Sequence, residues 1–266
     1  MTKALPLIAY PDLESRVNAL ENDGYVYLPK VINGEEIVEL KAAMDRLDII
    51  PESFDKHGTP ENGGFLNKHI NNAFNREITF LQYLDKPEVI EIEEAIHGKD
   101  CHVIGMTAWT TGPGRPDQTL HTDWLPISLP EDIVADPRVK IPVFITTCHY
   151  YLNDMYNELG PTNFVTGSHN SGRSPNGETE WKGGEERSIM CNAGDAVIFR
   201  SEVWHRGTAN TSDENRYLLQ VHYAHRMITQ KFPPYLNKFQ FNAGILSQAT
   251  AQQHRLLGDH NPSNYD

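Results

Sequence analysis

A histidine and an aspartate stand one residue apart, at His121 and Asp123, in the segment TLHTDWLP of residues 119–126. Imidazole nitrogens and carboxylate oxygens are both common ligands of first-row metals. Residues i and i+2 of a β-strand point to the same face, so both side chains reach one ion if the chain is extended there. With twelve histidines in the chain, however, an H-x-D pair also arises by chance. A metal site therefore requires a third ligand from elsewhere.

His205 is the candidate for this third ligand. It follows the strand-like run AVIF, and the segment HRGTANTS that it opens is rich in turn-forming residues, which predicts a loop. Two histidines and one carboxylate on one face of Fe(II) form the facial triad of non-haem oxygenases. Each residue taken singly also has a structural interpretation: His121 as a turn residue, Asp123 as a turn or cap residue, and His205 as a core histidine.

Arg216 stands eleven residues after His205, at the start of the strand-like segment RYLLQVHYAHR. A turn followed by a strand would return this side chain to the neighbourhood of the metal. A guanidinium group binds a carboxylate as a rigid two-pronged fork, which suits a dicarboxylate cosubstrate held at its far end.

The elements that must position these residues change in character along the chain. From residue 101 onward, short strand-like runs are separated by Gly, Pro, Asn and Asp, which predicts a mainly β protein with a sandwich or jelly-roll barrel and flanking helices. The predicted strands are CHVIGMTAWTT, PVFITTCHYYL, NFVTGSH, RSIMCNAGDAVIF and RYLLQVHYAHR.

Helices are expected mainly before and after these strands. The start of the chain predicts a helix, the strand GYVYLP and a helix over 34–47 with Asn33 as its N-cap, and Pro87 and Gly98 bound a further helix. We expect one domain of residues 1–266, with N-terminal helices over about 12–100, a jelly-roll core over about 101–226 and a C-terminal helix or lid over about 227–266, partly helical from about 244 to 257.

The motifs QTLHTDW, TGSH and GDAVIFRSEVWHRGTANTSDENR, together with the N-terminal NDGYVYLPKVINGEEIVELKAAM, resemble the phytanoyl-CoA dioxygenase family of Fe(II)/2-oxoglutarate oxygenases. The resemblance spans roughly residues 14–226. It implies a double-stranded β-helix, a jelly roll of the cupin type, in which His121, Asp123 and His205 bind Fe(II) and Arg216 binds the C5 carboxylate of 2-oxoglutarate. It also implies a reaction that consumes O2 and releases succinate and CO2.

The residue pattern departs from the family at Pro161 and Thr162, before the Gly-Ser-His signature, which leaves the substrate open. The carboxylate of Asp123 favours hydroxylation, desaturation or ring chemistry, because the related halogenases have a small residue in that place. Enzymes of this kind act on many metabolites, and we expect a small natural-product or amino-acid-like substrate.

Further residues near the motifs have both a functional and a structural interpretation. Thr107 and Trp109 lie on one face of the strand before the motif and are candidates for binding the cosubstrate C1 carboxylate, with core packing as the alternative. Trp124 and Trp204 either line the pocket or belong to the core. Segment 63–72, GGFLNKHINN, is either a solvated loop or a contact to substrate.

Composition excludes several classes of protein. The net charge of −13 disfavours nucleic acid, and the absence of a long apolar run predicts no membrane span. Three widely spaced cysteines and no signal sequence predict a cytoplasmic protein, as a monomer or homodimer.

Two other functional classes remain open. A cosubstrate-independent cupin-type dioxygenase or isomerase would have no use for Arg216, and a non-catalytic binding protein of the same fold would usually lose a ligand. No G-x-S-x-G elbow supports a serine hydrolase.

Overall fold

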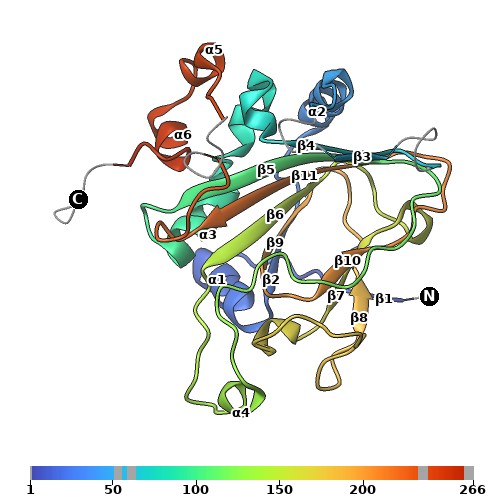
Figure 1. Ribbon diagram of the computed structural model, residues 1–266, viewed down its shortest axis with the longest axis vertical. Coiled ribbons are helices and arrows are strands. Elements are labelled where there is room, and N and C mark those ends of the chain that lie inside the picture. The colour runs from blue at the N-terminus through green and yellow to red at the C-terminus, as the bar shows by residue number, and fades with distance from the viewer. Residues whose placement is uncertain (1, 51–55, 59–63, 233–238, 261–266) are drawn as a thin grey trace.

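Two β-sheets face each other in the computed structural model, which describes residues 2–50, 56–58, 64–232 and 239–260 (Figure 1). The larger sheet has seven strands in the order β2-β9-β6-β11-β5-β4-β3, and the smaller has four in the order β1-β8-β7-β10. The strands are β1 Lys3–Ala4, β2 Tyr25–Leu28, β3 Lys56–Gly58, β4 Asn67–Asn71, β5 His102–Thr111, β6 Ile145–Tyr151, β7 Thr162–Val165, β8 Glu186–Ser188, β9 Ala196–Arg200, β10 His205–Gly207 and β11 Arg216–Ala224. The predicted mainly β, jelly-roll fold is confirmed.

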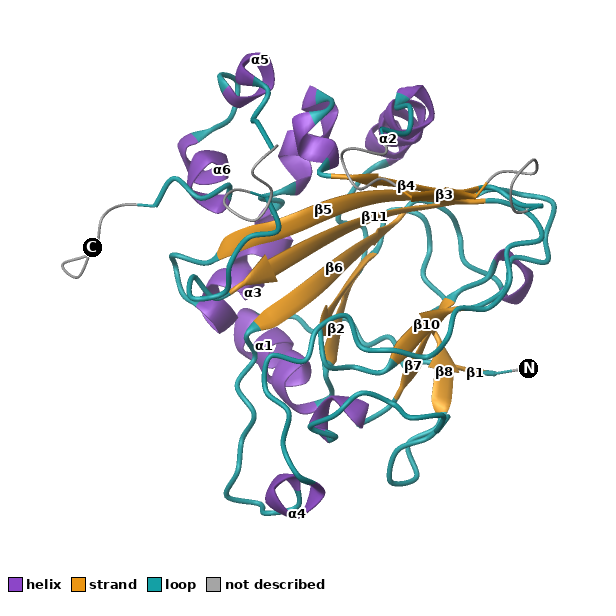
Figure 2. Ribbon diagram, in the orientation of Figure 1, coloured by secondary structure: helices purple, strands orange, loops and turns teal. Residues whose placement is uncertain are grey.

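The helices lie mainly on the side of the large sheet that faces away from the small one (Figure 2). Helix α4 projects away from this layer, at the tip of a long excursion between β5 and β6. The α-helices are α1 Leu13–Asn22, α2 Gly34–Arg46, α3 Pro87–His97, α4 Glu131–Val134, α5 Ala243–Leu246 and α6 Ala251–Leu256, and the 3-10 helices are η2 Ala73–Asn75, η3 Ile78–Tyr83, η4 Asn157–Leu159 and η5 Ser168–Asn170.

Helix boundaries follow local capping. Asn33 accepts hydrogen bonds from the backbone N–H groups of Glu35 and Glu36, and Glu36 bonds back to Asn33, so the predicted N-cap of α2 is confirmed. The segment over about 244–257 is partly helical, as predicted. Thr250 caps a new helix there, so the segment forms the separate helices α5 and α6. Parts of the predicted C-terminal lid, 233–238 and 261–266, lie outside the described residues.

The two faces of the large sheet differ, as β11 shows. Leu219, Val221 and Tyr223 point outward into the core under the helices. Arg216, Gln220 and His222 alternate with them and point inward, between the sheets, because successive side chains of a strand face opposite sides. On β11 the inner face therefore carries three polar side chains beside the apolar Leu218.

Segment 67–71 is strand β4 and not a loop, so the interpretation of this segment as a solvated loop is wrong. Its residues pair antiparallel with β5, with His69 opposite Trp109, and the two rings stack with centroids 3.9 Å apart. The long-range partner β5 supplies the hydrogen bonds that the polar segment cannot provide for itself. No helix within the described part of the chain is long and apolar enough to cross a membrane.

Candidate metal centre

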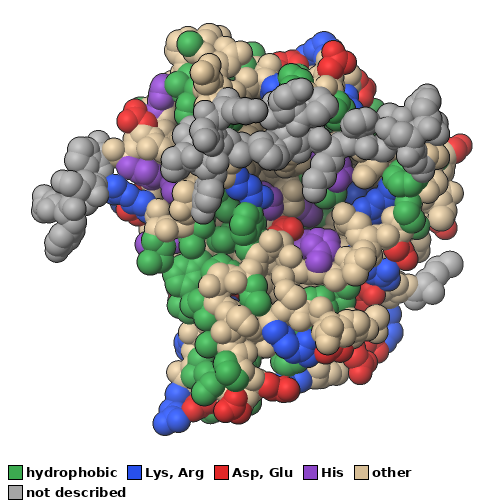
Figure 3. Space-filling model, in the orientation of Figure 1, with side chains coloured by type: hydrophobic (Ala, Val, Ile, Leu, Met, Phe, Trp, Pro, Cys, Tyr) green, Lys and Arg blue, Asp and Glu red, His purple; other side chains and the backbone are tan. Residues whose placement is uncertain are grey.

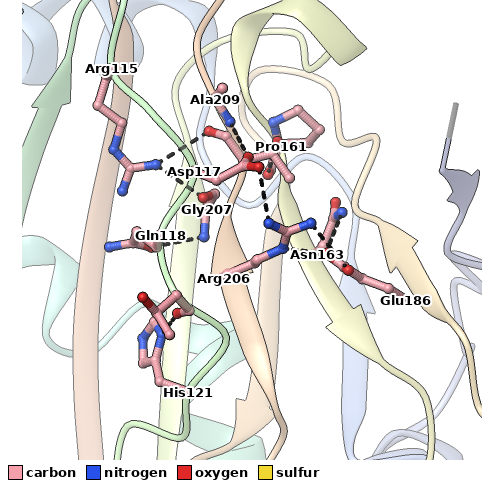
Figure 4. A network of polar contacts seen from close by, with 12 residues as sticks. Arg115, Asp117, Gln118, His121, Pro161, Asn163, Glu186, Arg206, Gly207 and Ala209 are labelled. Atoms are coloured by element: carbon pink, nitrogen blue, oxygen red, sulfur yellow. Dashed lines mark hydrogen bonds and ion pairs between the residues drawn. The ribbon is translucent and has the colours of Figure 1, made fainter. Parts of the chain in front are cut away.

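The segment after β5 is joined to β10 by backbone hydrogen bonds, and this pairing brings the H-x-D motif to the distal histidine. His121 and His205 exchange both N–H···O bonds, at 3.0 and 2.8 Å, as an antiparallel pair does. Further along, Gln118 bonds Gly207 through both backbone and side chain, and Arg115 donates to the carbonyl oxygen of Gly207 (Figure 4). The two histidines are thus held opposite each other by the chain itself.

His205 opens strand β10, so the prediction that it lies in a loop is wrong. Strand β10 is only three residues long and pairs with β7, which places His205 opposite Phe164. The turn-forming residues of its sequence begin just after the strand, and the long-range partner decides the backbone conformation at His205 itself.

Three ligand atoms converge at this point, one each from His121, Asp123 and His205, all within 4.8 Å of one another. The Oδ1 atom of Asp123 lies 4.0 Å from Nε2 of His121 and 3.5 Å from Nε2 of His205. Ligand bonds to a first-row metal are about 2 Å long, so atoms at these separations can share one ion after small adjustments. On the face shown in Figure 3, histidine and acidic side chains reach the surface beside one another between the sheets.

The hydrogen bonds fix which imidazole nitrogen faces the centre. Nδ1 of His121 lies 2.8 Å from the carbonyl oxygen of Thr119, and Nδ1 of His205 lies 2.9 Å from that of Val203. A carbonyl oxygen only accepts, so Nδ1 carries the proton in both rings and Nε2 keeps a free lone pair. This arrangement is the usual outer support of a metal-bound histidine.

The second oxygen of Asp123 is held separately. Thr147 donates its hydroxyl to Oδ2 at 3.1 Å, and the Gln220 amide approaches the same oxygen at 3.5 Å. Both partners come from the inner face of the large sheet, from β6 and β11. Oδ1 therefore remains available beside the two Nε2 atoms, and the donor set of two neutral imidazoles and one carboxylate fits a divalent iron ion.

Electrostatics agree with this donor set. Burial alone would raise the pKa of Asp123, but His205 holds that pKa well below its usual range. Burial alone would lower the pKa of His205, but the Asp123 carboxylate raises it above its ordinary value. The carboxylate is therefore ionised at neutral pH and offers its charge to whichever cation occupies the centre, a proton or a metal ion.

A narrow cavity continues from the triad toward Arg216 at the start of β11. Arg216 is buried, its Nη1 donates to the carbonyl oxygen of Gly160, and no carboxylate among the described residues pairs with it. Burial and the nearby Arg115 lower the pKa of Arg216 to about 10, which leaves it charged at neutral pH. The residues that line the cavity are Trp109, Gln118, His121, Asp123, His149, Thr162, His205, Gly207, Arg216, Leu218 and Gln220.

Three buried N–H groups of residues that line this cavity have no hydrogen-bond partner among the described residues. Two are Nε1 of Trp109 and Nε of Arg216. The third is Nδ1 of His149, whose protonation follows from its neighbour: Nε2 of His149 faces the Gln220 amide nitrogen at 3.2 Å and must accept from it. Buried donors without acceptors are costly, so the cavity is suited to an oxygen-rich anion.

The remaining candidates are placed as follows. Trp109 lines the cavity, whereas the Thr107 hydroxyl donates to Oδ1 of Asn71 at 3.0 Å and is not among the lining residues. Trp204 is fully buried in a core cluster with Trp181, which agrees with its core interpretation. Trp124 is only partly buried and packs perpendicular to His222.

Sequence reasoning missed His149, Thr147, Gln220 and Arg115. A partial signal existed, because Gln220 lies on β11 an even number of residues after Arg216 and so faces the same side. No local pattern distinguishes His149, Thr147 and Arg115 from ordinary core or loop residues. They come to the site through pairing between segments far apart in the sequence.

Comparison with known proteins places this arrangement in a family. A profile of the family described as phytanoyl-CoA dioxygenase (PhyH) matches residues 20–217. The chain belongs to the phytanoyl-CoA dioxygenase family, as its motifs predict, and is thus an enzyme of a dioxygenase class.

Individual relatives agree with this assignment. A protein named dioxygenase cdmA, from Talaromyces verruculosus, is 25% identical over 256 residues, which cover 92% of this chain and 82% of the relative. The epimerase SnoN, in complex with Fe3+, alpha-ketoglutarate and nogalamycin RO, has a TM-score of 0.64 at 18% identity, over 85% of this chain and 90% of SnoN. HygX from Streptomyces hygroscopicus, with nickel, 2-oxoglutarate and hygromycin B bound, has a TM-score of 0.63 at 12% identity, over 81% of this chain and 88% of HygX.

Proposed function

We propose that this protein is an Fe(II)- and 2-oxoglutarate-dependent oxygenase that oxidises an unactivated C–H bond of a small natural-product or amino-acid-like molecule. The reaction would be a hydroxylation, a desaturation or a ring formation, with release of succinate and CO2. The observation that carries this proposal is the cavity that joins three convergent metal ligands to a buried arginine, which has no acidic partner within the described part of the chain.

In this proposal His121, Asp123 and His205 hold the iron. Their support is the pair of Nδ1–H···O=C bonds, which orient both rings, and the Thr147 hydroxyl, which fixes the carboxylate. When bound, iron and 2-oxoglutarate together supply the reduction of O2 and the oxidising power for the C–H bond. The chain contributes position and the exclusion of water.

The cosubstrate would lie along the cavity with its C5 carboxylate at Arg216. A buried guanidinium binds a carboxylate strongly because both charges are removed from water and the geometry permits two parallel hydrogen bonds. The N–H groups of Trp109 and His149, which no described residue satisfies, offer further donors to the same molecule. A cosubstrate-independent enzyme would have no anion to balance Arg216, and this favours the 2-oxoglutarate-dependent function over that alternative.

The test is release of succinate from 2-oxoglutarate by the purified protein supplied with Fe(II) and O2. We expect Arg216→Ala to raise the KM for 2-oxoglutarate by about 10- to 100-fold, because a charge-assisted pair of this kind is worth roughly 1.5–3 kcal/mol. Arg46→Ala is the control, since Arg46 lies on α2, outside the cavity, and pairs with Glu77. Absence of succinate release by the wild type would contradict the proposal. So would an equal KM for 2-oxoglutarate in Arg216→Ala and Arg46→Ala.

A further inference from the structure

A further histidine lies close to the metal centre, on the inner face of the large sheet. His222 of β11 stands directly opposite Thr147 of β6 in the register of the two strands, and both side chains are buried. His222 is not one of the three residues whose ligand atoms converge, and it does not line the cavity that leads to Arg216. Its position therefore needs an explanation other than binding the metal or the cosubstrate.

The hydroxyl of Thr147 joins this histidine to a metal ligand. Oγ1 of Thr147 lies 3.1 Å from Oδ2 of Asp123 and 3.0 Å from Nδ1 of His222. The amide of Gln220 approaches the same carboxylate oxygen only at 3.5 Å, so Thr147 is the nearest donor to Oδ2 among the described residues. The side chains of His222, Thr147 and Asp123 thus form one continuous chain of hydrogen bonds.

The direction of the hydrogen bonds follows from the chemistry of the three groups. A hydroxyl has a single proton, and an ionised carboxylate is a stronger acceptor than a neutral imidazole. Thr147 therefore donates to Asp123, and Nδ1 of His222 carries a proton and donates to Thr147. Burial lowers the pKa of His222 to about 3, so the ring is neutral at neutral pH. Each bond of the chain polarises the next and strengthens the hold on the carboxylate.

The carboxylate depends on such support more than the two histidine ligands do. Both histidines are anchored on backbone carbonyl oxygens, which the fold itself fixes. Apart from these two histidines, the described residues hold the Asp123 carboxylate only through the side chains of Thr147 and Gln220. A hydroxyl hydrogen rotates to suit its neighbours. The N–H of His222 occupies a lone pair of Oγ1 and leaves the carboxylate as the acceptor for the Thr147 proton.

We propose that His222 is a positioning residue of the metal centre. It donates to Thr147 and through this hydroxyl holds the Asp123 carboxylate with Oδ1 beside the Nε2 atoms of the two histidine ligands. Loss of the donor leaves the carboxylate less well oriented and weakens metal binding, although His222 is not a ligand itself. This inference rests on the ligand set of the proposed function and adds a residue that supports it.

Two substitutions of similar size and shape test the donor itself. Asn has an amide N–H the same number of bonds from Cβ as Nδ1 of His222, and Leu has a methyl group there. We expect His222→Leu to weaken Fe(II) binding by about tenfold, the value of about one net hydrogen bond, and His222→Asn to stay within about twofold of the wild type. Anaerobic competition with a chelator measures this affinity on the metal-free protein. His222→Phe, which keeps a ring without the N–H, should behave as His222→Leu and replaces it if that variant does not fold.

A double substitution tests the route through Thr147. If His222 acts through the Thr147 hydroxyl, adding His222→Leu to Thr147→Val should weaken Fe(II) binding no further than Thr147→Val alone. His97→Leu is the matched control, because Nε2 of His97 lies 3.0 Å from the hydroxyl of the neighbouring Thr146 on the outer face. This control should leave the Fe(II) affinity unchanged. Thermal unfolding of each metal-free variant shows whether it is folded.

Three results would overturn the inference. Equal weakening by His222→Leu and His222→Asn would mean that the N–H of His222 has no part in metal binding. Full additivity of His222→Leu and Thr147→Val would mean that His222 acts by another route, and an unchanged affinity in His222→Leu would mean that Thr147 needs no second partner. The proposed function fails separately, because a wild type that binds Fe(II) but releases no succinate leaves the comparison of affinities unaffected.

Discussion

Thr146 and Thr147 are neighbours on β6 and point to opposite faces of the large sheet. The Thr146 hydroxyl donates to Glu93, which also pairs with His97 at 3.4 Å under helix α3. The Thr147 hydroxyl donates to Asp123 at the metal centre. On the outer face Glu93 is paired with a base, whereas on the inner face no acid among the described residues pairs with the buried Arg216.

This difference indicates what each face does. The outer face, with Leu219, Val221 and Tyr223 under the helices, stabilises the fold by burying apolar surface. The inner face retains buried donors at Trp109, His149 and Arg216 that no part of the described chain satisfies. Such groups are costly to folding and are explained by a ligand that completes them.

The largest effect is expected from Asp123→Ala on the inner face. Loss of the only carboxylate ligand should reduce succinate release by about 100-fold or more, because even the outer partners of metal ligands are worth about 10- to 100-fold. Thermal unfolding of the metal-free variant should change little, since the variant removes a partly buried charge. Succinate release at the wild-type rate would contradict the proposed ligand set.

The matching substitution on the outer face is Leu219→Ala. Leu219 is fully buried in the core under the helices, so its truncation should lower the free energy of unfolding by about 2–5 kcal/mol. The KM for 2-oxoglutarate of the remaining folded enzyme should stay the same. Denaturant unfolding followed by fluorescence, together with KM measurement, checks both statements, and a change in KM without loss of stability would break the distinction between the two faces.

The adjacent threonines sharpen the comparison. Thr147→Val removes a hydroxyl that supports Asp123, and we expect metal affinity, measured by competition with a chelator, to fall by about 10- to 100-fold. Thr146→Val should leave metal affinity unchanged and lower stability by about 1–3 kcal/mol, because Glu93 loses a buried donor. If Thr146→Val weakened metal binding and Thr147→Val did not, the two faces of the sheet would not have the separate roles described here.

The last prediction concerns the pH dependence of stability at a site away from the metal. The ring of His169 packs against Gly24, and burial, with a contribution from Arg200, lowers the pKa of His169 to about 3. The unfolded chain binds this proton first, so the contribution of His169 to stability is complete above about pH 6.5 and falls as the pH drops toward about 3. In His169→Asn the loss of stability over this range should be shallower by up to about 1.4 kcal/mol per pH unit. Urea unfolding at several pH values measures the free energy of unfolding of both proteins. If this free energy depends on pH in the same way in the wild type and in His169→Asn, His169 is not the group responsible.

The features that could be predicted from the sequence are those set by residues close together in the chain. Short strand-like runs between turn-forming residues predicted β5, β6, β9 and β11, and Asn33 and Gly98 predicted the start of one helix and the end of another. The spacing of His121, Asp123 and His205 gave three residues that the fold brings within reach of one ion. Arg216 followed from its position at the start of a strand.

What could not be predicted depends on partners far along the chain. Strand β4 is polar and becomes a strand because β5 pairs with it, and His205 is extended because β7 and His121 pair with it. His149 reaches the cavity from the middle of β6, where its neighbours are all buried and its type alone indicates a core residue. Register between strands, which local patterns do not contain, decides these positions.

The most direct test of the account is anaerobic titration of the metal-free protein with Fe(II) and 2-oxoglutarate, followed by the weak charge-transfer absorption that such a complex gives in the visible range. We predict that this absorption appears in the wild type, is absent in His205→Ala, and needs far more 2-oxoglutarate in Arg216→Ala. If iron binds but 2-oxoglutarate does not change the spectrum, the cosubstrate assignment is wrong and a cosubstrate-independent metal enzyme takes its place.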